Sequence, residues 1–139
     1  MTAELYHRDM VERARRGFGK GRLQQASASV TVDNPLCGDR VTLDITRVGD
    51  RVSAVGHEVK GCLLCEAAAA TIAEFAHGKS VDDLKAMSVA VTDLMHKGIQ
   101  PPASFSCLEV FAPVHNAKSR RDCVLLPFEA LGKALRAAF

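Results

Sequence analysis

The hydrophobic residues of this 139-residue chain change their spacing near residue 60. Before that point, residues 41–46 alternate strictly between apolar and polar side chains, and residues 30–32 begin a similar alternation. A period of two predicts strands with one buried face. The pair Gly49-Asp50 suits a two-residue hairpin turn, with residues 51–60 as the returning strand. We therefore expect a three-stranded antiparallel meander from about 26 to 60.

The rest of the chain favours helices. An alanine-rich run covers residues 66–76, and an apolar stripe at helical spacing follows Ser80 and ends near Gly98. Further helices are expected over 3–16, over 104–111 and from Pro127 onward, since proline favours the first helical turn. Strands followed by helices predict an α+β fold, a three-stranded antiparallel sheet packed by helices, as a single domain over residues 1–139.

Composition narrows the class of protein. The chain is 47% hydrophobic and 24% charged, which is ordinary for a soluble globular domain. It has no apolar run long enough to span a bilayer and no signal-peptide pattern at its start, so we expect a cytoplasmic protein without membrane contact. The net charge of +2 is too small to indicate nucleic-acid binding. Basic residues within 13–22 form either a solvated face or a docking patch for an acidic partner.

Three cysteines stand at expected boundaries between elements. Cys37 lies in a turn between strands and is followed two residues later by Asp39, Cys62 directly precedes the alanine-rich helix, and Cys123 precedes the last helix. Three thiolates and one carboxylate complete a four-coordinate shell for zinc or iron. A helix N-terminus also favours the thiolate form of a nearby cysteine. The alternative is that these cysteines fill space in the core as small apolar residues.

The other cysteines and the histidines are less informative. With five cysteines in all, complete pairing into disulfides is impossible, and a reducing compartment fits better. Cys65 forms a C-x-x-C with Cys62, which is either a dithiol or a core residue next to the site, while Cys107 is expected in the core. His57 is expected at the surface or a sheet edge, and His115 is a candidate spare metal ligand. The remaining histidines are expected to be solvated: His7, His77 and His96.

These motifs together resemble a known family. The run Asn34-Pro35-Leu36-Cys37-Gly38-Asp39, the pair Gly61-Cys62 that opens an alanine-rich helix, and the late Cys123 are similar to the U-type iron–sulfur cluster assembly proteins, namely IscU, SufU and the N-terminal domain of NifU. The resemblance implies a metal or cluster site at one end of the sheet, with Cys37, Asp39, Cys62 and Cys123 as ligands. It also implies sulfur supply by a cysteine desulfurase and delivery to downstream iron–sulfur acceptor or assembly proteins.

Within the family, the chain leans to the SufU type. It carries a long segment over 98–122, and its ending from Cys123 to Leu131 resembles that branch. Asp122 stands where the IscU type has a histidine, and the Leu-Pro-Pro-Val-Lys chaperone motif is absent from the sequence. The stretch Arg15-Arg16-Gly17-Phe18-Gly19 also departs from the Pro-Arg-Asn-like element that usually ends the leading helix of SufU-type proteins.

The residues leave several functions open. The first is a scaffold, a carrier rather than a true enzyme, that holds a transient [2Fe–2S] cluster. The second is a zinc-dependent sulfurtransferase of the SUF pathway, with Cys123 as the candidate persulfide acceptor because residues 112–122 read as a mobile, polar loop. A purely structural zinc site in an interaction domain is the third. The sequence alone does not decide between zinc and a cluster.

Overall fold

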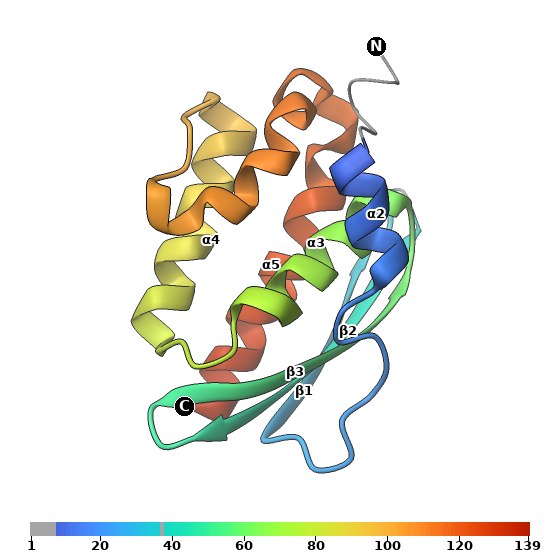
Figure 1. Ribbon diagram of the computed structural model, residues 1–139. Coiled ribbons are helices and arrows are strands. Elements are labelled where there is room, and N and C mark those ends of the chain that lie inside the picture. The colour runs from blue at the N-terminus through green and yellow to red at the C-terminus, as the bar shows by residue number, and fades with distance from the viewer. Residues whose placement is uncertain (1–7, 37) are drawn as a thin grey trace.

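The computed structural model describes residues 8–36 and 38–139. A short helix, α2 (Arg8–Arg16), precedes three strands, β1 (Ala28–Asn34), β2 (Asp39–Val48) and β3 (Arg51–Lys60). Two helices follow, α3 (Leu63–Phe75) and α4 (Val81–Lys97). The 3₁₀ segments η1 (Ala103–Asn116) and η2 (Lys118–Arg120) then lead into the last helix, α5 (Arg121–Ala138) (Figure 1). None of the helices in this described part combines the length and apolar character needed to cross a bilayer.

The three strands form the predicted antiparallel meander, in the order β1-β2-β3. Val48 pairs with Arg51, so the β2–β3 connection is the expected two-residue turn at Gly49-Asp50. Gly49 has a φ of 63°, a left-handed conformation that glycine adopts without steric cost. Between β1 and β2, the amide of Gly38 donates to the carbonyl of Asn34 at 2.8 Å and closes a tight turn. The fold class predicted from the sequence is confirmed.

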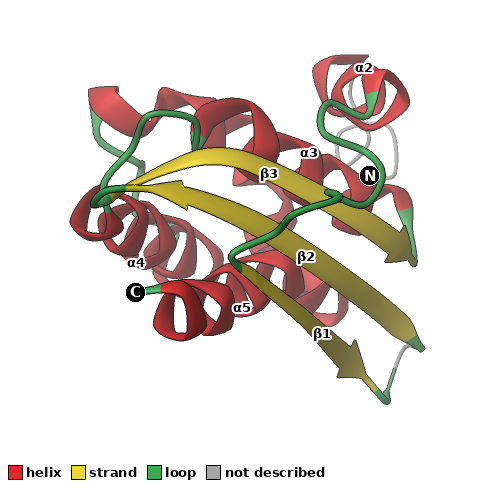
Figure 2. Ribbon diagram, turned by 90° about the horizontal axis from the view of Figure 1, so that it is seen from below, coloured by secondary structure: helices red, strands yellow, loops and turns green. Residues whose placement is uncertain are grey.

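The helices cover one face of the sheet. Figure 2 shows α3, α4 and α5 gathered on the same side of the three strands. The alternation in β2 directs Val41, Leu43 and Ile45 into this layer, where all three are fully buried. The small alanines of α3 are also buried and let the helix pack closely against its neighbours. The core therefore lies between the sheet on one side and helices α3 and α5 on the other. The ends of the strands lie at the edge of this core.

Two predictions about the C-terminal half were wrong. The last helix begins at Arg121, six residues before the expected Pro127, which lies inside α5. Proline's preference for the first turn is a local one, and here burial of α5 residues before Pro127 extends the helix in spite of it. The segment 112–122 is also not a loop: it continues η1, passes through η2 and enters α5, and Val114 within it is fully buried.

The helix predicted over 3–16 is described only from Arg8 onward.

Candidate metal centre

Three of the four predicted ligands converge on one point. The Asp39 carboxylate and the thiols of Cys62 and Cys123 place their ligand atoms all within 4.8 Å of one another. The fourth predicted ligand, Cys37, lies outside the described residues, so its place in the site stays a prediction. Residues far apart in the chain thus form one cluster of soft and hard donors.

The antiparallel topology explains the convergence. The start of β2 and the end of β3 lie at the same end of the sheet (Figure 2). Asp39 is the first residue of β2 and Cys62 follows the end of β3, so the two residues are brought together there. Cys62 is the N-cap residue of α3, and its side chain makes no capping hydrogen bond. Cys123 is the third residue of α5, whose first turn reaches this end. One strand start and two helix starts therefore build the site.

The carboxylate of Asp39 is buried without its full set of partners. The residue is 6% exposed, and its Oδ2 atom has no hydrogen-bond partner among the described residues. An unsatisfied buried acceptor of this kind costs about 1–3 kcal/mol, and more when it is charged. Two other buried side-chain atoms in the described part share this state, His57 Nδ1 and Ser88 Oγ, but neither belongs to a cluster of metal-ligating groups. A buried carboxylate with one unpartnered oxygen and two thiols within 4.8 Å fits a cation.

The electrostatics of Cys123 lead to the same conclusion. Burial, followed by the hydrogen bond and charge interaction with Cys62, raises the pKa of the Cys123 thiol to about 12. A hydrogen bond with Arg120 lowers this pKa and the Asp39 charge raises it, but burial dominates. The protein alone therefore disfavours several anions in this cluster. A bound cation supplies the opposite charge, and thiolate with carboxylate donors are ligands that zinc and iron accept.

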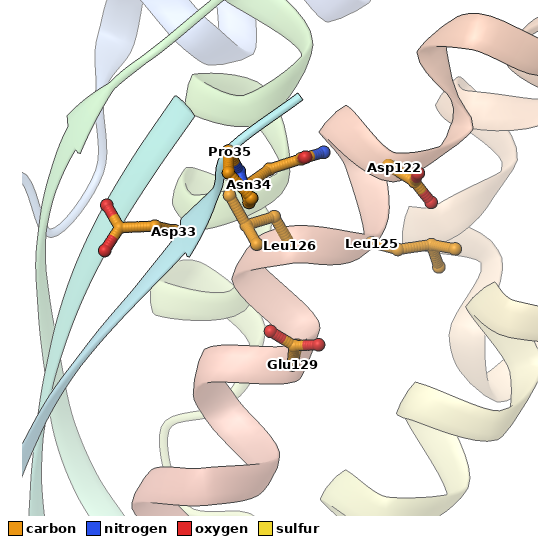
Figure 3. Close-up of a pocket in the computed structure, with 7 residues that line it drawn as sticks. All are labelled: Asp33, Asn34, Pro35, Asp122, Leu125, Leu126 and Glu129. Carbon is orange, nitrogen blue, oxygen red and sulfur yellow. The ribbon is translucent and has the colours of Figure 1, made fainter. Parts of the chain in front are cut away.

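A cavity of about 330 Å³ lies between the end of β1 and the first turns of α5 (Figure 3). Two of its lining residues are neighbours of the proposed ligands: Asn34 pairs with Asp39 in the sheet, and Asp122 directly precedes Cys123. No member of the cluster lines it. Three of its seven lining residues are acidic, and the others are apolar or amide side chains: Asp33, Asn34, Pro35, Asp122, Leu125, Leu126 and Glu129. The wall of this cavity is therefore partly acidic, and one of its carboxylates, Asp33, is paired with Arg40 at 2.6 Å.

The remaining cysteines stand apart from the cluster. Cys65, in the first turn of α3, is fully buried in the core, as one of its two readings predicted. Cys107 packs against the core with part of its side chain exposed, and burial raises the pKa of its thiol. Its carbonyl accepts a 2.6 Å hydrogen bond from Arg13. Neither thiol belongs to a group of metal-ligating side chains among the described residues.

The described histidines do not join the cluster either. The Nδ1 atom of His115 hydrogen bonds with the carbonyl of Met95 at 2.8 Å, so this ring packs against the end of α4. The prediction for His57 was wrong, because the residue is 3% exposed rather than at the surface. Its Nε2 atom bonds with the carbonyl of Phe18 at 2.8 Å, and the glycine-rich segment before β1 covers it. Burial lowers the pKa of His57.

The sequence reasoning missed two residues next to the cluster. Arg120 hydrogen bonds with the Cys123 thiol and lowers its pKa. Its spacing of three residues from Cys123 at a helix start is a signal that points to such a contact. Gly61 was noted only as part of the Gly-Cys motif, yet the Asp39 carboxylate lies directly against it.

Comparisons with known proteins agree with the fold and identify a family. The sequence profile of the NifU-like N-terminal domain matches residues 5–137. The chain is 28% identical to the zinc-dependent sulfurtransferase SufU of Bacillus subtilis, over 94% of this chain and 89% of that protein. It is 25% identical to the iron–sulfur cluster assembly scaffold protein IscU of Streptococcus pyogenes, over 95% of this chain and 83% of that protein.

Solved structures give the same result. A NifU-like protein (N-terminal) from Brucella abortus superposes with a TM-score of 0.92 at 28% identity, covering 99% of this chain and 96% of that one. A candidate iron–sulfur cluster assembly scaffold protein for the SUF system, from Fervidobacterium islandicum AW-1, superposes with a TM-score of 0.89 at 25% identity. That match covers 97% of this chain and 99% of the Fervidobacterium chain.

Proposed function

Because the chain belongs to the family of NifU-like N-terminal domains, we propose that it is an iron–sulfur cluster assembly scaffold that accepts sulfur from a cysteine desulfurase. The observation that carries the proposal is the convergence of Asp39, Cys62 and Cys123 at one end of the sheet, with a carboxylate oxygen left unpartnered. Cys37, two residues before Asp39, is the proposed fourth ligand. The cluster is cargo that the protein holds and passes on, so the chain acts as a carrier.

The mixed donor set fits a transient holder. Thiolates are soft donors that suit iron–sulfur clusters, whereas a carboxylate oxygen is harder and suits them less well. Asp39 thus provides one weaker bond in an otherwise strong ligand set. We infer that this position opens first when the cluster moves to an acceptor protein.

A second candidate function is zinc-dependent sulfur transfer, favoured by the near full-length match to a relative that carries this name. In the proposed step, the Cys123 thiolate attacks the outer sulfur of a desulfurase persulfide. A new S–S bond forms on Cys123, and the desulfurase thiolate leaves with the electron pair of the broken bond. When bound, zinc would keep the site thiols deprotonated. Arg120, which hydrogen bonds with the Cys123 thiol, also favours the anion.

Access to the reacting sulfur limits this second candidate. Cys123 is 4% exposed, and it follows helical segments instead of the predicted loop, whereas Cys62 is half-buried. A desulfurase must therefore uncover the start of α5 before Cys123 can react. Proposed partners are the desulfurase and downstream iron–sulfur acceptor or assembly proteins, in the cytoplasm.

One experiment separates the two functions. The zinc-loaded protein is mixed with a desulfurase and cysteine, without iron, and persulfide is located by peptide mass spectrometry. Persulfide on Cys123 with faster desulfurase turnover supports the relay, whereas persulfide on Cys62 alone contradicts the role of Cys123. No persulfide, together with a stable [2Fe–2S] spectrum after anaerobic reconstitution, supports the scaffold.

A matched pair of variants tests the ligand set in the same assays. Cys62→Ser is expected to bind neither zinc nor an iron–sulfur cluster, because it removes one of the proposed thiolate ligands. Cys107→Ser is the control, since Cys107 is not among the grouped metal-ligating side chains, and it is expected to bind zinc and the iron–sulfur cluster as the wild type does. Equal loss of zinc in the two variants would show that the assignment of Cys62 is wrong.

A further inference from the structure

We propose that Gly61 is a positioning residue for the metal centre, and that it acts only through Asp39. The inference rests on the proposed ligand role of Asp39 and adds a residue that donates nothing to the metal. Gly61 has no side chain, and its function is to leave the space in which the Asp39 carboxylate lies.

The register of the sheet places the two residues side by side. Arg40 of β2 pairs with Lys60 of β3, and the strands run antiparallel. One further step along the same register sets Asp39 opposite Gly61, just beyond the last pair of the ladder. Side chains at opposite positions of an antiparallel pair are close neighbours. The carboxylate of Asp39 can therefore lean across the end of β3.

The contact leaves no room for even a methyl group. A Cβ atom built on Gly61 would lie 2.8 Å from Oδ1 of Asp39, 2.9 Å from its Cγ and 3.3 Å from its Cβ. The first two separations are shorter than carbon–oxygen and carbon–carbon contacts allow. The atoms in the way are the end of a rotatable side chain, so a substitution at Gly61 would move the carboxylate rather than the sheet.

Backbone conformation does not explain this glycine. Gly61 has no positive φ, so no left-handed conformation requires glycine at this position. Gly38 is the contrasting case, with a φ of 77° and no atom within 4 Å of a built Cβ. The turn at Gly38 needs glycine for its backbone, whereas position 61 needs glycine for the space above it.

The consequence is a defined position for an otherwise unsupported ligand. The Oδ2 atom of Asp39 has no hydrogen-bond partner among the described residues that would fix its direction. Gly61 lies directly against the Oδ1, Cγ and Cβ atoms of the same side chain, so it forms one wall of the space that holds the carboxylate. Because Gly61 also precedes Cys62, the same short segment sets the positions of two donors.

A double-mutant cycle on zinc affinity tests the proposal. Zn²⁺ binding is measured by competition with a chromophoric chelator for the wild type, Gly61→Ala, Asp39→Ala and the double variant. We expect Gly61→Ala to lower zinc affinity by about 10–100-fold, the usual loss when a residue that orients a ligand is changed. In the Asp39→Ala background the same substitution should change affinity by less than about twofold, because residues that act through one contact are not additive.

Two controls separate positioning from general damage. Gly132→Ala in α5 places its new Cβ 3.7 Å from the nearest atom, an ordinary contact, and should leave zinc affinity unchanged. Co²⁺ in place of zinc reports ligand geometry, so Gly61→Ala should shift the visible absorption bands toward those of Asp39→Ala. If Gly61→Ala does not fold, removal of the carboxylate in the double variant should restore folding.

The possible failures are distinguishable. If Asp39→Ala binds zinc as tightly as the wild type, then the ligand role of Asp39 fails, and with it the role of Gly61. If Asp39→Ala weakens binding but Gly61→Ala does not, only the positioning role is overturned. The same holds if Gly61→Ala is equally harmful with and without the Asp39 carboxylate, or if its misfolding persists in the double variant.

Discussion

Asp39 and Asp44 lie five positions apart on the same strand, and both are buried. Asp44 is fully enclosed by donors: Arg22 contacts it through Nε at 2.7 Å and Nη2 at 3.1 Å, and the Leu23 amide donates at 3.0 Å. The Ser29 hydroxyl donates to it as well. Asp39 has one oxygen with no partner among the described residues and two thiols beside it. The protein itself supplies the hydrogen-bond donors to the Asp44 carboxylate, whereas Asp39 keeps an oxygen that is available to a metal ion.

The difference also appears in the protonation of Asp44. Burial opposes its ionisation, but the hydrogen bonds from Arg22, Ser29 and Leu23 outweigh burial and lower the pKa of Asp44. Asp44 therefore contributes to stability as a structural anion. A buried carboxylate without such donors contributes to folding only when something else binds it.

The largest effect is expected from Asp44→Ala. The substitution removes several charge-assisted hydrogen bonds, so unfolding of the metal-free protein should require about 3 kcal/mol less free energy. Chemical denaturation under reducing conditions measures this difference. Zinc affinity should be unchanged. A large loss of zinc affinity would contradict the assignment of Asp44 as a structural residue and Asp39 as the metal ligand.

Acid should weaken the same contribution. Because the pKa of Asp44 is lower in the folded state, its stabilisation is full above the unfolded value of about 3.9 and is lost as the pH falls through the folded value. The stability difference between the wild type and Asp44→Asn should therefore shrink as the pH falls below about 4. Denaturant titrations at several pH values test this, and a constant difference would contradict the role of Asp44 as an anion.

A smaller loss is expected from Ser29→Ala. The Ser29 hydroxyl hydrogen bonds with Asp44 and accepts from Arg22 at 2.8 Å, while Arg22 keeps its own contacts with the carboxylate. Losing this single hydroxyl should cost about 1 kcal/mol of unfolding free energy. A cost as large as that of Asp44→Ala would mean that Ser29, and not Arg22, is the main partner.

The smallest effect on stability is expected from Asp39→Ala. The variant removes a buried oxygen that has no partner, so the metal-free protein should lose less than about 0.5 kcal/mol or become slightly more stable. Thermal unfolding with a chelator present gives the comparison. A loss like that of Asp44→Ala would show that Asp39 is a structural residue.

The sequence predicted the parts of this fold that depend on local pattern. Alternation of apolar and polar residues located the meander, and Gly49-Asp50 located its hairpin. The start of α5 was missed because Pro127 is a local signal, whereas burial of the preceding turn depends on tertiary packing. His57 was misplaced for a similar reason, since the segment that covers it lies far away in the chain.

The candidate site shows the same division. A resemblance in short motifs implied Asp39, Cys62 and Cys123 as ligands, and the topology brings these three together. The distinction between Asp39 and Asp44 was not visible, because Arg22 is 22 residues from Asp44 and no spacing rule links them. The reason for glycine at position 61 depends on the register of β2 and β3, which only the structure supplies.

The central claim is that Asp39 completes a shell of three thiolates, and zinc X-ray absorption spectroscopy tests it most directly. The zinc-loaded protein should show three sulfur neighbours at about 2.3 Å and one oxygen at about 2.0–2.2 Å. In Asp39→Ala, the protein-derived oxygen should be lost while the three sulfurs remain. A shell of four sulfurs in the wild type, with Cys65 in the place of Asp39, would contradict the account.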